Sequence, residues 1–379
     1  MVPELQWNQL VPESNPFMLY GQLRLIEESQ KHNMQFKYAF IKNQDLTVGI
    51  VYFQVVRFTG NDLLNYFPES PAGFKKYLYG FIQYISKLLV SRINVKLLVS
   101  GNVFMTGENG FYFQHSLSKK ERSFLLLKAI DEVAKTDDKI KGILIPDLYQ
   151  PKSDFDKGFV ENGFNEITVE ADMGIKLKPE WKSFDDYLNA LSSKYRVRAK
   201  KVIALCNENG VIKKELTESD IEKYEDKLFE LYQDVMSRAE FKLATLEKDY
   251  FRMQKKSLPY TYRVFSYFKD DEMIGFISLY QFGKKMEVHY TGMNPEKCKP
   301  IHLYQHMLYD MISFGIVNAV EKLHFGRTAP EIKSTIGAVP SPMYGYLKHF
   351  NPFLNFFLVR TFTSNLKPKD YVIRNPFKV

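Results

Sequence analysis

The chain has 379 residues, which is enough for about two domains with separate hydrophobic cores. Its hydrophobic content of 45% and aromatic content of 15% are typical of a globular protein and exclude a largely disordered chain. The only two cysteines, Cys206 and Cys298, fall in no metal-ligand spacing. They exclude a disulfide framework, so we expect a cytoplasmic protein with no metal site.

The positive charge is concentrated in the second half of the sequence. Residues 1–180 hold 21 Lys and Arg against 21 Asp and Glu, whereas residues 181–379 hold 31 against 23. A basic half favours an anionic partner such as a phosphorylated cofactor, a tRNA or a lipid surface. Scattered surface lysines are the alternative, but Arg196 and Arg198 lie in a local basic cluster that favours binding.

The first half alternates predicted strands and helices. Apolar, β-branched runs predict strands at 48–58, 95–100 and 142–146. Apolar residues at helical spacing predict helices over 72–90 and 120–135. The alternation indicates a layered α+β fold rather than an all-helical or all-β one.

The second half repeats this outline. Ser183 is a predicted helix cap, and the helix that follows continues to Asn209 and Gly210. Ser219 and Glu222 form a capping-box pattern before another helix. Strands are predicted at 262–268, 273–282 and 286–291, followed by a helix over 303–320. A short strand at 323–325 completes the repeat.

A turn with two cations follows this last strand. Gly326 ends the strand, Pro330 suits the first turn of a short helix, and Gly337 closes that helix. Arg327 and Lys333 flank the turn, where free backbone N–H groups attract an anion. The alternatives are a solvated connection, or an Arg327 that braces the turn by bonding strand carbonyls.

Three sequence segments carry a resemblance to a known family. They are Phe-Gly-Arg-Thr at 325–328 with a later lysine, Met-Glu-Val-His-Tyr-Thr-Gly at 286–292, and the helical basic stretch at 181–201. Together they resemble FemAB-like proteins of the GNAT superfamily of N-acyltransferases. The resemblance implies a tandem duplicated GNAT-like α+β fold with mixed central sheets flanked by helices. Its two domains would span residues 1–180 and 181–379.

The chemistry that the resemblance implies is acyl transfer from an activated donor to an amine. His289 is the expected general base, and Tyr304 is expected to donate a proton to the leaving group. A satisfied strand histidine and a core tyrosine are the alternatives for these two residues. The residues expected to bind substrate are Arg327, Lys333, Thr328, Arg196 and Arg198.

The donor stays open at this point. The superfamily commonly binds acyl-CoA with a glycine-rich run that is absent here, and 105–110 and 294–300 occupy the corresponding places. An acyl-CoA-type donor is the first expectation, an aminoacyl-tRNA with a cell-wall precursor as acceptor is the second, and a catalytically inactive binding module is the third. No DNA partner is expected, and no secretion signal or transmembrane run is recognised. The Phe-rich stretch at 344–362 predicts a tail over the core or, alternatively, a peripheral membrane contact.

Overall fold

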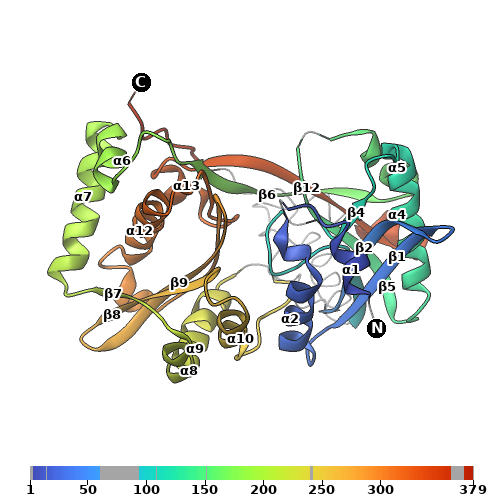
Figure 1. The fold of residues 1–379 in the computed structure, drawn as a ribbon, viewed down its shortest axis with the longest axis horizontal. Helices are drawn as coiled ribbons and strands as arrows, with labels where there is room; N and C mark the ends of the chain where they lie inside the picture. The colour runs from blue at the N-terminus through green and yellow to red at the C-terminus, as the bar shows by residue number, and fades with distance from the viewer. Residues whose placement is uncertain are drawn as a thin grey trace, which may run out of the picture. The chain divides into compact units, whose positions relative to one another are not determined.

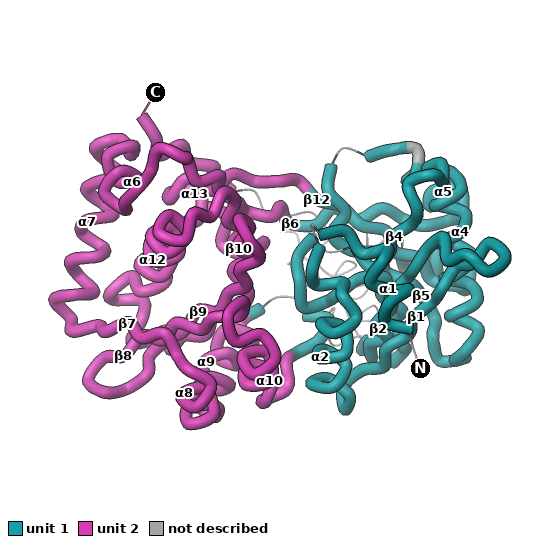
Figure 2. Tube along the Cα trace, viewed as in Figure 1, with its two compact units in different colours: residues 1–169, 239–245, 343–368 teal, residues 170–238, 246–342, 369–379 magenta. Residues whose placement is uncertain are grey.

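The computed structural model describes residues 3–13, 15–59, 94–107, 109–150, 152–239, 242–359 and 371–378, so the helix predicted over 72–90 lies outside the described residues. The chain forms two compact units, and each is discontinuous in sequence (Figure 2). Unit 1 comprises residues 1–169, 239–245 and 343–368, and unit 2 comprises residues 170–238, 246–342 and 369–379. Our division into tandem domains at residue 180 stays a prediction.

Unit 1 is built on a mixed sheet. Its strands are β1 (Gln35–Asn43), β2 (Leu46–Thr59), β3 (Asn94–Val99), β4 (Phe111–Phe113), β5 (Ile140–Tyr149) and most of β12 (Val339–His349). Its described α-helices are α1 (Glu4–Asn8), α2 (Tyr20–Gln30), α4 (Lys119–Ala134), α5 (Asp154–Glu161) and α14 (Pro352–Leu354), with a π-helical turn following at Asn355–Val359. The strands are ordered β1-β2-β3-β5-β12, and β4 pairs with β2. Only β3 and β5 are parallel among the pairs given by their register.

Alternation along β2 shows why helices cover both faces of this sheet. Val51, Phe53 and Val55 belong to a core cluster that includes residues of α4 and α5. Ile50 and Tyr52, which point the opposite way, pack in a second cluster with residues of α1 and α2. Successive side chains of a strand point to opposite faces of the sheet. A strand such as β2, with apolar residues pointing to both faces, must therefore be buried on both faces.

Unit 2 is likewise built on mixed strands. Its strands are ordered β6-β11-β10-β9-β8-β7, namely β6 (Asn165–Lys176, which begins in unit 1), β11 (Lys322–His324), β10 (Lys285–Met293), β9 (Glu272–Phe282), β8 (Tyr262–Lys269) and β7 (Ile212–Glu215). Its helices are α6 (Phe184–Ala190), α7 (Ser193–Glu208), α8 (Glu218–Lys223), α9 (Glu225–Met236), α10 (Tyr250–Ser257), α11 (Pro295–Cys298), α12 (Leu303–Val317) and α13 (Pro330–Ser334). Only the β10–β11 pair is parallel among these neighbours.

Helices again cover both faces of the unit 2 sheet (Figure 1). Residues of α6, α7 and α12 form the main core with the strands, and α9 and α10 lie against the other face. The close approach of α9 to β10 depends on Gly292. A Cβ there would lie 2.2 Å from the ring of Phe276 and 2.8 Å from the backbone of Leu231.

Two predicted helix details were wrong. The helix expected to run from Ser183 to Asn209 is two helices, because Leu191 is extended and forms a β-bridge with Phe377. Tertiary pairing with the C-terminal segment therefore interrupts a continuous helical pattern. The capping box lies two residues earlier than expected: Thr217 accepts from the backbone N–H of Asp220, whose side chain accepts in return.

Other predicted features have the following outcomes. Cys206 and Cys298 are buried and not disulfide-bonded. Among the described residues, no helix is both long and apolar enough to cross a bilayer. The first residues of the Phe-rich stretch belong to β12, and Phe353 and Phe356 that follow are exposed. The end of that stretch, from residue 360, lies outside the described residues.

Candidate functional site

The parallel strands β10 and β11 separate after three residue pairs. Their register runs from Lys285 opposite Lys322 to Glu287 opposite His324, whereas β10 continues to Met293 along β9. The β9–β10 register also shifts between Val288 and Thr291. Such a bulge re-aims side chains and is common beside functional sites. His289 therefore lies in an irregular segment just beyond the last rung between β10 and β11.

His289 is surrounded by tyrosines from four elements. Its ring centroid lies 4.4–6.2 Å from the ring centroids of Tyr290, Tyr280, Tyr250 and Tyr262. Its Nε2 lies 3.4 Å from the hydroxyl of Tyr250, which lies 3.2 Å from that of Tyr280. Burial raises the pKa of Tyr250 and of Tyr280 well above the ordinary value, so both phenols stay protonated at neutral pH.

Arg327 lies in the turn that follows β11. The backbone enters the left-handed region at Gly326 (φ 72°) and again at Ala329 (φ 55°). Burial raises the pKa of Tyr290 well above its ordinary value, the nearby Tyr232 adds to the rise, and the positive charge of Arg327 opposes it. The guanidinium is therefore close to the residue next to His289. Arg327 is half-buried, whereas Thr328 is exposed.

Lys333 lies beneath this turn. Its side chain is only 2% exposed, and its Nζ donates to the carbonyl oxygens of Phe325 at 2.7 Å and Gly326 at 3.1 Å. Burial lowers the pKa of Lys333 to about 7, and the charges of Asp172 and Glu170 oppose the fall. The brace that we considered for Arg327 is thus made by Lys333.

The other three expected site residues lie elsewhere in unit 2. Arg196 and Arg198 belong to α7, and α12 lies between α7 and β10 in the view of Figure 2. Tyr304, in the first turn of α12, is partly buried against the main core, and burial raises its pKa above the ordinary value. The structure therefore places Arg327 within electrostatic reach of Tyr290, the neighbour of His289, whereas no contact of Arg196, Arg198 or Tyr304 with these residues is found in the described part of the chain.

A buried group of ionisable residues was missed at the sequence level. Nδ1 of His324 lies 2.6 Å from Oδ2 of Asp172, and these residues are 3% and 1% exposed. Glu287, 8% exposed, lies opposite His324 in the β10–β11 register. His324 directly precedes the quoted Phe-Gly-Arg-Thr segment, so its position was a usable signal. Nothing in the sequence linked it to Asp172, which lies 152 positions away.

The loop after β10 corresponds to the usual cofactor loop of the superfamily. Asn294 caps α11 by accepting from the backbone N–H groups of Glu296 and Lys297 at 3.0 and 3.2 Å. The next two N–H groups, of Cys298 and Lys299, donate to backbone carbonyls of the same loop. Four consecutive backbone amides of this loop are thus already bonded within the protein.

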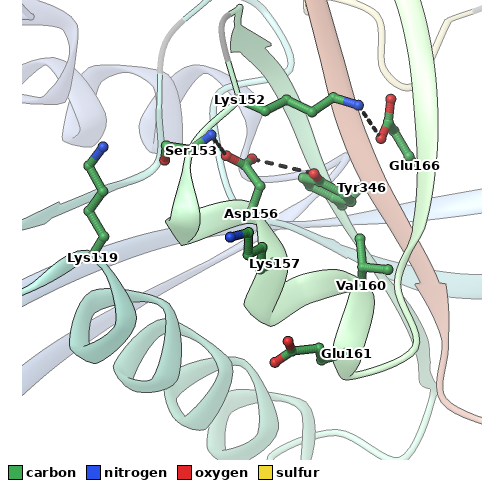
Figure 3. A pocket seen from close by; sticks show the side chains of 9 residues that line it. All are labelled: Lys119, Lys152, Ser153, Asp156, Lys157, Val160, Glu161, Glu166 and Tyr346. Carbon is green, nitrogen blue, oxygen red and sulfur yellow. Dashed lines mark hydrogen bonds and ion pairs between the residues drawn. The ribbon is translucent and has the colours of Figure 1, made fainter.

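Unit 1 has a separate open pocket of about 690 Å³ (Figure 3). It is lined by three lysines and three acidic residues among others, namely Lys119, Lys152, Ser153, Asp156, Lys157, Val160, Glu161, Glu166 and Tyr346. Much of its polar lining is paired internally. Lys152 pairs with Glu166 at 2.5 Å, and Asp156 accepts from Ser153 N–H and from the hydroxyl of Tyr346. Its charges balance, so we assign the chemistry to unit 2.

Within the described residues, no three side chains of His, Cys, Asp or Glu are grouped closely enough to hold a metal ion. The buried thiols do not supply a nucleophile either, because burial raises the pKa of Cys206 to about 11 and that of Cys298 to about 12. The acid–base chemistry considered below is that of the ionisable groups near the β10–β11 separation.

Comparison with known proteins defines the family. The profile of the FemAB-like family, described as peptidoglycan biosynthesis/recognition, matches residues 109–367, which is more than half of the chain. The chain belongs to the FemAB-like family. No curated protein matches it.

Solved structures show the same fold. FemX aligns with a TM-score of 0.57 and 14% identity, over 94% of this chain and 98% of that chain. A tandem GNAT protein from the clavulanic acid biosynthesis pathway aligns with a TM-score of 0.50 and 9% identity, over 84% of this chain and 83% of that chain. The expected FemAB-like resemblance and the GNAT-like fold of mixed sheets flanked by helices are confirmed. Family and fold together support an acyl- or aminoacyl-transferase kind of function.

Proposed function

We propose that unit 2 transfers an aminoacyl or other acyl group from an activated ester or thioester to an amine. The observation that carries the proposal is the arrangement just beyond the last β10–β11 rung. There, a histidine in a β-bulge lies beside Tyr290, and the positive charge of Arg327 opposes the rise that burial causes in the pKa of Tyr290. A base and a cation near one point are what attack by an amine on an ester requires.

His289 is proposed as the base. An attacking amine must lose a proton as the new C–N bond forms, and an imidazole nitrogen can accept it. The neutral phenol of Tyr250, 3.4 Å from Nε2, would orient the ring. Surrounding aromatic rings would limit the access of water, which would otherwise hydrolyse the activated donor.

Arg327 is proposed to hold an anionic part of a substrate, with Thr328 as a neighbouring hydroxyl. The guanidinium is planar and binds phosphate or carboxylate with two parallel hydrogen bonds. Lys333 would contribute by holding the two carbonyls that precede Arg327. Arg196 and Arg198 lie on α7, away from Arg327. A substrate that contacts them as well as Arg327 would have to be an extended polyanion such as a tRNA, because a small anion would be too short.

Of the two donor classes, the structure of the α11 loop favours the aminoacyl ester over acyl-CoA. Superfamily members that bind CoA use loop amides for the pyrophosphate, and here Asn294 and loop carbonyls occupy four of them. The family description points to an amine of a peptidoglycan precursor as the acceptor. We therefore propose aminoacyl-tRNA as the first donor to test and acyl-CoA as the second.

The test is a transfer assay read by mass spectrometry. The protein is mixed with a panel of aminoacyl-tRNAs or acyl-CoAs and with amine-bearing cell-wall precursors. A mass increase of the acceptor by one acyl group is the expected result. Arg327→Ala should lower turnover strongly and Arg327→Lys should recover little of it, because a point charge does not replace a bidentate fork. Arg24→Ala, which removes an exposed helical ion pair in unit 1, serves as the control.

Recognition without turnover is the second candidate function. It is favoured by the family description, which includes recognition, and by the satisfied amides of the α11 loop. Tight binding of a precursor, measured by calorimetry, with no product from any donor would support it. That result, or full activity in a folded Arg327→Ala variant, would overturn the proposed transfer site.

A further inference from the structure

Three buried ionisable side chains form a row across strands β10, β11 and β6. Glu287 and His324 occupy the last rung of the parallel pair, and Asp172 bonds the far side of the imidazole at 2.6 Å. At the other end, Nζ of Lys285 lies 2.8 Å from a carboxylate oxygen of Glu287. Basic and acidic side chains alternate along the row, and the row ends at the point where the two strands separate.

Such a row is a costly way to stabilise a fold. Taking each ion out of water costs several kcal/mol, and well-packed apolar residues of similar volume often do as well. Burial raises the pKa of Glu287, while the charges of His324 and Lys285 oppose the rise. Nε2 of His324 is buried and makes no hydrogen bond to the described residues. The row is therefore better explained by a geometric role than by its contribution to stability.

The row is connected to the Arg327 turn through two routes. The first is backbone pairing, because Met173, next to Asp172, bonds both Phe325 at 2.8 Å and Gly326 at 3.2 Å. The second is Lys333, whose Nζ holds the carbonyls of the same two residues. The negative charge of Asp172 favours the ammonium form of Lys333, as does that of Glu170.

We propose that Asp172, His324 and Glu287 are positioning residues that fix the rung at which β10 and β11 separate and thereby orient the turn that presents Arg327. The inference rests on the proposed function, because that proposal gives Arg327 the role of binding the anionic part of a substrate. The charged groups coupled to the row are Lys285 from β10, which pairs with Glu287, and Lys333 from α13, on which the charge of Asp172 acts; Glu170 on β6 is exposed and acts on Lys333 alone. Neutralising a member of the row should move Arg327 without removing it.

The first experiment needs no turnover. Protein labelled with ¹⁵N and ¹³C in arginine and lysine is studied by NMR, and the Arg327 and Lys333 side-chain signals are assigned with Arg327→Lys and Lys333→Met. Asp172→Asn and Glu287→Gln, which keep the side-chain shape, should shift the Arg327 Nε signal. Asp172→Asn should also lower the midpoint of the Lys333 titration below its wild-type value near pH 7. Glu321→Gln, which removes an exposed carboxylate beside β11, should change neither signal.

The second experiment is a double-mutant cycle on the transfer assay. If Asp172 acts by orienting Arg327, Asp172→Asn should lower kcat/KM about tenfold, and should lower it little further in an Arg327→Ala background. Additive losses, or an Arg327 signal that stays unmoved in Asp172→Asn and Glu287→Gln, would overturn the inference. If no donor gives turnover, the NMR result alone decides the inference. Failure of the proposed function can therefore be distinguished from failure of this inference.

Discussion

Two histidines on neighbouring strands of unit 2 have opposite surroundings. His289 on β10 is half-buried among phenol rings, and its Nε2 lies 3.4 Å from the hydroxyl of Tyr250. His324 on β11 is almost fully buried in a row with two carboxylates, one of which lies 2.6 Å from its ring. The first environment offers neutral hydrogen-bonding groups, and the second offers formal charges in a low-dielectric interior.

This difference suits His289 to proton transfer and His324 to fixing the positions of strands. A base that takes a proton from a substrate needs access, which fits the half-buried His289. A residue held by a buried carboxylate is costly to leave unpaired, which fits a role in fixing the positions of strands. Sequence interpretation favoured His289 alone, and the structure adds His324 as a second histidine with a different role.

The largest expected effect tests the buried side of the comparison. Asp172→Ala should lower the free energy of unfolding by about 3–5 kcal/mol, because it leaves a buried ionisable partner uncompensated. Chemical denaturation of both proteins at pH 7 measures the change. A loss below 1 kcal/mol would show that the 2.6 Å pair carries no special stability.

The next effect tests the exposed side. His289→Asn should lower turnover by about 100-fold, the lower end of what a general base contributes. Its free energy of unfolding should change much less than that of Asp172→Ala, because His289 is only half-buried. Denaturation and the transfer assay on the same variant separate the two properties. Equal activity in His289→Asn and wild type would show that another group acts as the base.

A pH effect sharpens the contrast by way of Lys333. Its pKa is about 7 in the folded protein and about 10.5 in the unfolded chain, so the unfolded state binds more protons between these values. Folding stability should therefore rise with pH across this window, by about 2 kcal/mol between pH 7 and pH 9. Denaturation at both pH values measures it. In Lys333→Met this part of the rise should vanish, and an unchanged slope would contradict the buried ammonium.

The smallest expected effect concerns the phenol beside His289. Tyr250→Phe removes the hydroxyl that lies near both His289 and Tyr280. Because a neutral hydrogen bond contributes about 1 kcal/mol, the free energy of unfolding should fall by about that amount. Activity should fall modestly if the hydroxyl only orients the imidazole. A loss as large as that of His289→Asn would instead give Tyr250 a direct part in proton transfer.

The positions of several strands in unit 2 were predictable because local sequence patterns and tertiary burial agree there. The predicted strands at 262–268, 273–282 and 286–291 fall within β8, β9 and β10. In contrast, β6 was missed. Its sequence carries Glu166, Glu170 and Asp172, so it lacks the continuous apolar run by which central strands are recognised. His324 bonds the carboxylate of Asp172, which helps this strand to carry a buried acidic residue.

The candidate site was predictable in the same uneven way. Arg327 was found because Gly326 and Pro330 define a turn from local sequence. Its companion Lys333 was expected to bind an anion beside Arg327, but the structure buries it, although lysine is almost never fully buried unless it is paired. Only the fold shows that two backbone carbonyls bond its ammonium group.

By itself, the sequence determined the features that depend on near neighbours. These include most strands, the turn that Gly326 and Pro330 define around Arg327 and the segments that indicate the FemAB-like family. The tertiary structure decided which side chains from distant segments share an environment. It placed Asp172 against His324 across 152 positions and broke the helix at Leu191 by pairing it with Phe377. The physical reason is that propensity acts within a few residues, whereas ion pairing and burial act between whatever the fold brings together.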